Sequence, residues 1–136
     1  MTDKELLLTA REARKNAYAP YSGFAVGAAL LCEDGRVFTG CNVENSSYPA
    51  GCCAERAALY AAVTAGARTF TALAVAGWQE DAQPGECMPC GFCRQALCEF
   101  SKDLRVVAGT PENLRVYSLK ALLPHRFGAH SPKEAI

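Results

Sequence analysis

Hydrophobic and polar positions change their spacing several times along the first half of the chain. Apolar residues recur at nearly helical intervals over residues 4–18, until the Ala-Pro pair at 19–20 ends the pattern. Two uncharged apolar runs follow at 24–31 and 37–43, and the Asp-Gly pair between them is typical of a hairpin turn. The pattern therefore predicts one helix followed by two antiparallel strands.

The second half alternates between the same two kinds of pattern. Residues 52–65 predict a helix that stops at Gly66, and residues 69–78 predict a buried strand rich in Val, Ala and aromatic side chains. After a polar loop, residues 87–100 predict a loop that enters a third helix. Two more strands at 103–109 and 114–118 and a short helix at 118–124 complete the pattern. Helices that alternate with buried strands predict an α/β fold with helices on both faces of a sheet.

Composition narrows the class of protein. A chain of 136 residues fits one domain spanning residues 1–136, and we expect only the tail after about residue 127 to be loosely ordered. The 14 basic and 14 acidic residues cancel, so no net field attracts a nucleic acid or an anionic membrane. The first 15 residues hold only a short apolar run followed by charges, which predicts neither a signal peptide nor a membrane span. We therefore expect a cytoplasmic protein.

The cysteines carry the strongest chemical signal. Eight cysteines in a reducing compartment favour metal binding, catalysis or core packing over disulfides. Cys90 and Cys93 form a CxxC motif after a proline, and Cys53 and Glu55 form a CxE motif upstream. Their combination matches the signature of the zinc deaminases in its three-cysteine variant. The CxE spacing favours Cys53 over its neighbour Cys52 as the ligand.

Helix geometry indicates where a metal would lie. Residues two apart in a helix interior point about 200° apart, so Cys53 and Glu55 serve one centre only if it lies beyond the helix N-terminus. Cys90 and Cys93 would share the first turn of the next helix, and two helix N-termini would then meet at one Zn²⁺. Three thiolates leave the fourth position open for water. Glu55 is suited to moving protons, and Arg56 to compensating the excess negative charge.

Four sequence motifs resemble those of the short, homotetrameric cytidine deaminases: YAPYSGFAVGAAL at 18–30, NVEN at 42–45, CAER at 53–56 and PCGFCRQ at 89–95. The resemblance covers about residues 5–127. It implies a three-layer α/β/α fold with a five-stranded mixed sheet and one zinc ion per subunit. It further implies hydrolytic deamination of cytidine and 2'-deoxycytidine to the uridines, with release of ammonia, in pyrimidine salvage. By similarity, Glu55 passes a proton from the zinc-activated water to the ring nitrogen and then to the departing amine.

The same resemblance implies contacts with the nucleoside. Phe24 matches the family's aromatic residue that packs against the pyrimidine, and the backbone of Ala54 would bind the edge of the base. Asn42 and Glu44 match the pair that binds the ribose hydroxyls. These four residues would form most of the substrate site within one subunit.

Other matched positions imply that subunits share their sites. Tyr48 and Phe127 match residues that the family lends to a neighbouring subunit, so a homotetramer would complete each pocket. Gln95 matches a polar position close to Arg56 and the zinc cysteines. Phe92 is a departure, because the family usually has a small residue between the two cysteines.

Several alternatives remain open on the sequence alone. A redox protein would use the CxxC motif as an exchanging dithiol, and a structural zinc protein would bind the metal without needing Glu55. Within the deaminases, blasticidin-S deaminases are close relatives and polynucleotide editors are more distant. The carboxylate of Glu44 and the lack of surplus basic residues favour a free nucleoside over both.

Overall fold

The computed structural model describes residues 1–128 of the 136-residue chain. The elements follow one another as α1 (Asp3–Arg14), β1 (Phe24–Cys32), β2 (Val37–Cys41), a 3₁₀ turn η1 (Tyr48–Ala50), α2 (Ala54–Thr64), β3 (Phe70–Gln79), α3 (Gly91–Cys98), β4 (Arg105–Thr110), β5 (Asn113–Ser118) and α4 (Leu119–Leu122). The tail expected to be loosely ordered falls mostly on residues 129–136, which lie outside the described part. None of the helices within residues 1–128 has the length and apolar character that a membrane-spanning segment needs.

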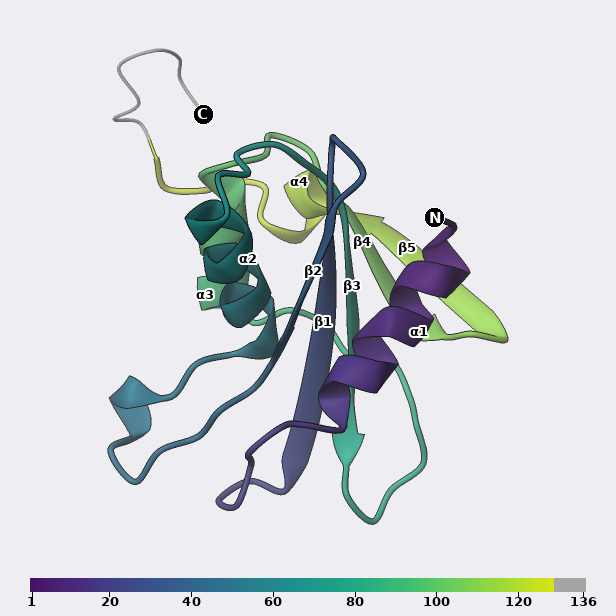
Figure 1. Ribbon diagram of the computed structural model, residues 1–136, viewed down its shortest axis with the longest axis vertical. Helices are drawn as coiled ribbons and strands as arrows, with labels where there is room; N and C mark the ends of the chain where they lie inside the picture. The colour runs from purple at the N-terminus through teal and green to yellow at the C-terminus, as the bar shows by residue number, and fades with distance from the viewer. Residues whose placement is uncertain (129–136) are drawn as a thin grey trace.

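The five strands form one mixed sheet in the order β2-β1-β3-β4-β5 (Figure 1). Strand β1 is antiparallel to both β2 and β3, whereas β3 and β4 are parallel and β4 and β5 are again antiparallel. The parallel pair requires a crossover, and α3 lies within it. The predicted α/β class, with five strands in a mixed sheet, is confirmed.

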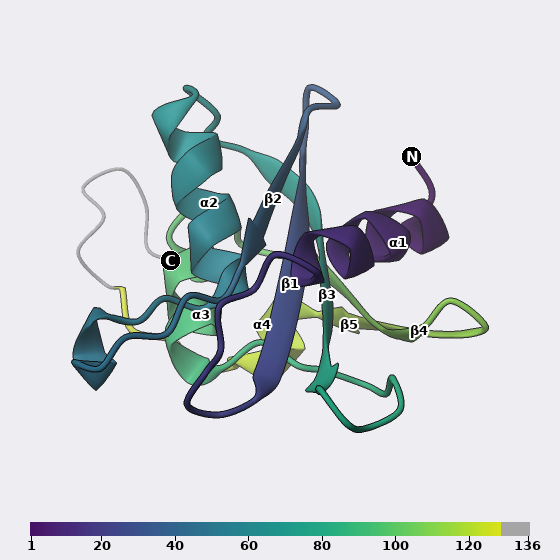
Figure 2. The same ribbon diagram turned by 60° about the horizontal axis from the view of Figure 1, so that its bottom comes forward.

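Helices cover both faces of the sheet, with α1 on one side and α2, α3 and α4 on the other (Figures 1 and 2). The alternation of side-chain size along β3 explains how the layers fit. Leu73 and Val75 enter the larger core beneath α2 and α3, whereas the alanines that alternate with them, such as Ala74, face α1. Small residues on that face allow α1 to lie close to the strands.

Two glycines permit the closest helix-to-sheet approaches. A Cβ atom at Gly27 of β1 would lie 2.0 Å from the carbonyl oxygen of Ala10 in α1. A Cβ atom at Gly40 of β2 would lie 2.4 Å from the carbonyl oxygen of Ala54 and 2.5 Å from the amide nitrogen of Ala58. The first turn of α2 therefore rests directly on the backbone of β2.

We expect the Gly40→Ala substitution to destabilise the fold, because the added methyl group meets helix backbone that can move only if α2 shifts. Overpacking of this kind costs about 1–3 kcal/mol, which lowers Tm by several degrees for a chain of this size. Thermal unfolding followed by circular dichroism measures the effect. Gly85→Ala is the control, since nothing lies within 4 Å of its Cβ position. Equal melting temperatures for the two variants would contradict the close contact.

The first helix is shorter than the spacing of residues 4–18 predicts. It ends at Arg14, because the chain around Tyr18 pairs with the segment after β2 instead of continuing the helix. The Tyr18 amide donates to the carbonyl of Asn42, and the Glu44 amide donates to the carbonyl of Tyr18. This long-range pairing ties residues 18–23 to residues 42–44, and Val43 pairs in turn with Cys52 just before α2.

Candidate metal centre and active site

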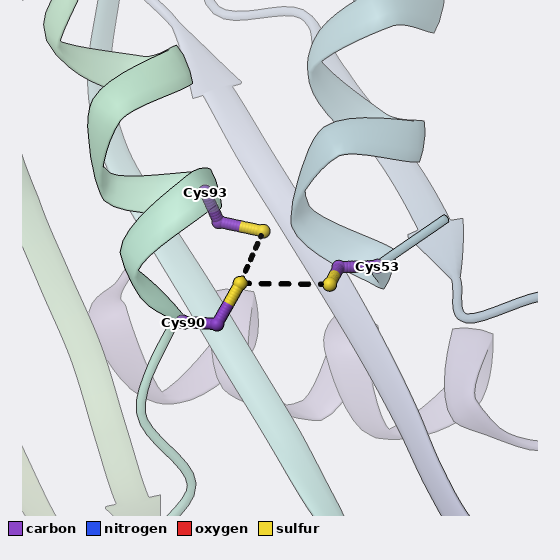
Figure 3. A group of neighbouring side chains, drawn as sticks. All are labelled: Cys53, Cys90 and Cys93. Carbon is purple, nitrogen blue, oxygen red and sulfur yellow. Dashed lines mark hydrogen bonds between the residues drawn. The ribbon is translucent and has the colours of Figure 1, made fainter. Parts of the chain in front are cut away.

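The sulfur atoms of Cys53, Cys90 and Cys93 lie together between α2 and α3 (Figure 3). The Sγ atoms of Cys53 and Cys90 are 3.6 Å apart, those of Cys90 and Cys93 are 3.5 Å apart, and all three lie within 4.8 Å of one another. None of the three forms a disulfide. Residues 37 and 40 positions apart in the sequence are thus brought to one point by the fold.

This arrangement fits a zinc ion. Tetrahedral zinc holds each thiolate at about 2.3 Å, which places two bound sulfurs roughly 3.8 Å apart. The observed separations of 3.5 and 3.6 Å are within a few tenths of an ångström of that value. Among residues 1–128, this group of three cysteines is the set of Cys, His, Asp and Glu side chains placed to hold a metal. Three protein ligands leave one position for a further ligand, as in catalytic zinc sites.

Both helices present their N-termini to the sulfurs. Cys53 is the N-cap residue of α2 and Cys90 is the N-cap residue of α3, while Cys93 lies one turn further along α3. Neither N-cap thiol forms a side-chain capping hydrogen bond, so both are free to face the metal position. The positive ends of the two helix dipoles favour thiolates there.

Hydrogen bonds adjust the charge on the sulfurs. Donation from Cys93 and from Arg56 lowers the pKa of Cys53 to about 5, against the opposing effect of burial. The pKa of Cys93 is raised, chiefly because its proton is held by Cys53. Arg56 donates from Nη2 to the Cys53 sulfur at 3.6 Å, and this bond raises the pKa of Arg56 and keeps it cationic. These hydrogen bonds therefore favour the thiolate form at Cys53 and the thiol form at Cys93.

Arg56 also has a polar atom without a partner. Its Nε is buried and makes no hydrogen bond with the described residues, and its guanidinium lies 5.9 Å from the centroid of the Phe92 ring. A buried donor of this kind is costly unless it is satisfied. When the other cysteines also become thiolates, their negative charge would stabilise the Arg56 cation. This supports the expectation that Arg56 compensates the charge of the three sulfur ligands.

We expect the Arg56→Gln substitution to lower turnover about 10-fold to 100-fold, because loss of a hydrogen-bond partner of a ligand typically has that effect. Without the cation, the three thiolates would leave more negative charge on a bound zinc ion, which would then make a water molecule less acidic. The measurement is the pH profile of activity for the zinc-loaded variant, with Arg56→Lys as the variant that keeps the charge. Wild-type turnover with an unchanged profile in Arg56→Gln would contradict this role.

Glu55 is a buried carboxylic acid beside the sulfurs. Only 4% of its surface is exposed, and it is the one charged side chain in the core of the described part of the chain. Burial raises the pKa of Glu55 to about 7, and the nearby Cys53 thiolate adds to this rise, while a hydrogen bond with Cys93 and the charge of Arg56 oppose it. A carboxyl group that gains and loses a proton near neutral pH is suited to general acid–base work.

An open depression lies beside the three sulfurs and reaches Cys53. Its volume is about 680 Å³, ample for a small molecule. It is lined by Tyr21, Ser22, Asn42, Val43, Glu44, Asn45, Tyr48, Pro49, Gly51, Cys52, Cys53, Arg56 and Phe92. The metal position and a substrate-sized space are therefore adjacent.

Asn42 and Glu44 both line this depression, and both are held by backbone groups. Asn42 accepts from the amide of Val26 and donates to the carbonyl of Phe24, each at 2.8 Å. One Glu44 oxygen accepts from the amides of Tyr21 and Ser22 at 2.9 and 3.1 Å. A hydrogen bond from the Ser22 hydroxyl, followed by the Ser22 amide, lowers the pKa of Glu44, so it is an anion at neutral pH. Tyr21 and Ser22 were not singled out from the sequence, although they lie inside the YAPYSGF motif.

Phe24 and Ala54 are not among the residues that line the depression. Phe24 begins β1 and is partly buried against the larger core, and one of its ring carbons would lie 3.1 Å from a Cβ atom at Gly77. Ala54 is the first residue of α2 and has no exposed surface, so only its backbone is available to a ligand. Their substrate contacts remain predictions.

Tyr48 and Phe127 are large aromatic residues at the surface, with 74% and 72% of their area exposed. Tyr48 lines the depression and makes an edge-to-face contact with Tyr21, with ring centroids 5.8 Å apart. The carbonyl of Phe127 accepts a hydrogen bond from Gln95 Nε2 at 2.9 Å, so Gln95 joins α3 to the C-terminal segment. This contact was not expected from the sequence.

The remaining cysteines are not brought to the metal position. Cys52 lines the depression, and its thiol donates to the carbonyl of Cys53 at 3.4 Å. Cys87 is buried, and burial raises the pKa of its thiol to about 12. Cys32 and Cys98 are buried, whereas Cys41 is only half-buried. All eight cysteines of the chain are free thiols.

Comparison with known proteins agrees with this geometry. Residues 1–110 match the family described as the cytidine and deoxycytidylate deaminase zinc-binding region. A cytidine deaminase of Sporosarcina psychrophila is 50% identical over 100 residues, which cover 74% of this chain and 71% of the relative. A cytidine deaminase of Halalkalibacterium halodurans is 42% identical over 130 residues, which cover 93% of this chain and 96% of the relative.

Solved structures show the same fold. The crystal structure of cytidine deaminase from Burkholderia pseudomallei superposes with a TM-score of 0.84 at 49% identity and covers 93% of this chain and 100% of its own. A crystal structure of cytidine deaminase from Mycobacterium tuberculosis superposes with a TM-score of 0.79 at 43% identity, covering 94% of this chain and 98% of its own. With the family match spanning most of its length, this chain belongs to the cytidine and deoxycytidylate deaminase family.

Proposed function

We propose that this protein is a zinc-dependent cytidine deaminase, which converts cytidine and 2'-deoxycytidine to uridine and 2'-deoxyuridine and releases ammonia. The observation that carries the proposal is the grouping of three cysteine sulfurs at two helix N-termini, next to a buried glutamic acid and a substrate-sized depression. Cys53, Cys90 and Cys93 would hold one zinc ion per subunit.

When bound, zinc supplies a Lewis-acid position that makes a water molecule acidic enough to act as a nucleophile at neutral pH. The protein's part in the reaction is proton transfer and orientation. Glu55 accepts the proton that water gives up, delivers it to the ring nitrogen and serves again when the amine departs. Its raised pKa, about 7, suits both directions of transfer. Burial of Glu55 keeps bulk water from exchanging these protons.

The ribose would lie against Asn42 and Glu44. The Glu44 carboxylate accepts three hydrogen bonds from Tyr21 and Ser22, and a carboxylate has about four acceptor sites, so it retains room for a ribose hydroxyl. The internal bonds hold Glu44 rigid before the substrate arrives. A free nucleoside fits this site better than a polynucleotide, because the lining includes this anion and the chain has no net positive charge.

A homotetramer with shared sites would cover the exposed aromatic residues. Tyr48 and Phe127 expose most of their surface next to the depression or to α3, and a neighbouring subunit would bury them against its own pocket. Eight free thiols suit the reducing cytoplasm, where we place the enzyme in pyrimidine salvage.

The test is conversion of cytidine by the zinc-loaded protein, followed by the fall in absorbance of cytosine and by ammonia release. The matched control is the same preparation after removal of zinc with a chelator, which should be inactive until zinc is restored. Parallel assays with 2'-deoxycytidine and blasticidin S distinguish the two small-molecule deaminase activities. Zinc-loaded protein that releases neither uridine nor ammonia would overturn the proposal and leave a structural zinc site.

A further inference from the structure

Arg94 joins two segments of the chain, the loop before α3 and the end of α4. Its Nε donates to the carbonyl of Pro89 at 2.8 Å, and its Nη1 donates to the carbonyl of Leu122 at 2.8 Å. Pro89 comes directly before Cys90 and its side chain is fully buried, while Leu122 ends α4. Arg94 itself follows Cys93 in the first turn of α3. One side chain therefore touches both the loop that carries a metal ligand and the segment that leads to Phe127.

The neighbouring residue extends the same connection. Gln95 donates to the carbonyl of Phe127 itself, so two consecutive side chains of α3 hold the C-terminal segment at Leu122 and at Phe127. The segment between these two points has no helix or strand of its own. Arg126 of this segment also donates to the carbonyl of Lys102 at 3.2 Å, so the path of the segment depends on side-chain bonds more than on regular backbone pairing.

We propose that Arg94 is a positioning residue that holds two parts of the chain at a fixed distance from each other. These are the loop that ends at Cys90 and the segment from Leu122 to Phe127, which we call the Phe127 segment. The inference rests on the proposed function, because it assumes that Cys90 binds zinc and that Phe127 completes a nucleoside pocket. Arg94 contacts neither the metal nor the substrate. It acts on zinc retention through Pro89 and on substrate binding through Leu122.

The chemistry of the bridge requires an arginine. A guanidinium offers several donors in a rigid fork and is always charged, so it can satisfy two carbonyls in different directions at once. Hydrogen bonds from a charged donor to a buried acceptor are stronger than neutral ones, and their loss leaves the acceptor unsatisfied. A lysine ammonium on a flexible stem cannot reproduce this geometry. Arg94→Ala should therefore loosen both segments, and Arg94→Lys should loosen them partly.

The experiment measures two quantities on the zinc-loaded enzyme. The first is the rate of zinc release to a coloured chelator without substrate, which should rise about 10-fold to 100-fold in Arg94→Ala and less in Arg94→Lys. The second is KM for cytidine, which should rise several-fold while kcat falls less. Arg68→Ala is the matched control, because Arg68 also donates to two backbone carbonyls, those of Val63 and Ala67, away from the site. It should leave both quantities unchanged.

A double-mutant cycle separates positioning from general loosening. If Arg94 acts on substrate binding through the Phe127 segment, Arg94→Ala should raise KM much less in a Phe127→Ala background, while zinc release stays fast. An equal rise of KM in both backgrounds overturns the proposal, as does wild-type behaviour of Arg94→Ala or of Arg94→Lys in both measurements. These outcomes require a wild-type enzyme that binds zinc and deaminates cytidine. A wild type that does neither overturns the proposed function first and this inference with it.

Discussion

Replacing Glu55 with glutamine should lower kcat for cytidine about 1,000-fold to 10,000-fold, at the upper end of what general acid–base catalysis contributes. Glutamine has nearly the same shape and fills the same buried space, but it cannot take up a proton. Its replacement therefore removes proton transfer without opening a cavity. Steady-state rates of uridine formation measure the loss, and elemental analysis of the purified variant measures its zinc content, which should stay near one ion per subunit.

Glu99→Gln is the control for this prediction. Glu99 follows α3 as its C-cap residue and is exposed, so its neutral variant should keep full activity. A Glu55→Gln enzyme with wild-type turnover would show that another group moves the protons. Loss of zinc from that variant would show that Glu55 holds the metal and would contradict a three-cysteine site.

The second large effect is expected from the paired cysteines at the start of α2. Cys53→Ala should lose most of the bound zinc, because the substitution removes a direct ligand. Its activity should fall by more than about 100-fold, the upper end of the loss that follows when only a hydrogen-bond partner of a ligand is removed. Cys52→Ala should keep its zinc, because the Cys52 thiol is not grouped with the three sulfurs and donates instead to a backbone carbonyl. Zinc content and activity of both variants, purified in parallel, measure the difference.

Cys52 and Cys53 are adjacent residues of the same type, so the two variants are closely matched controls for each other. Both substitutions remove one sulfur from the same turn of chain, so general effects on folding are shared. Equal loss of zinc in the two variants, or greater loss in Cys52→Ala, would contradict the assignment. Thermal unfolding of the zinc-free proteins should differ little between them, which separates metal loss from misfolding.

Much of this architecture is predictable from local sequence. Helical spacing and uncharged apolar runs locate the helices and strands apart from the 3₁₀ turn η1, and glycine or proline lies near several of their ends. The cysteine spacing also predicts the metal group, because CxE and CxxC motifs at helix starts restrict where the sulfur atoms can point. Cys53, Cys90 and Cys93 come together as that spacing requires.

The parts that the sequence did not predict depend on long-range contacts. The first helix ends at Arg14 because Tyr18 pairs with the segment around Val43, and no local pattern marks that partner. In the same way, the bond from Gln95 to Phe127 and the bridge through Arg94 join residues about 30 positions apart. Such contacts follow from how the layers pack, which spacing along the chain does not reveal.

Zinc K-edge X-ray absorption of the resting, zinc-loaded enzyme tests the central claim most directly. We predict three sulfur neighbours at about 2.3 Å and one oxygen or nitrogen neighbour at about 2.0–2.1 Å, which corresponds to three cysteines and an exchangeable position. Four sulfur neighbours would mean a closed structural site, and fewer than three would mean that the grouped cysteines do not bind the metal together. Either result would contradict the enzymatic account.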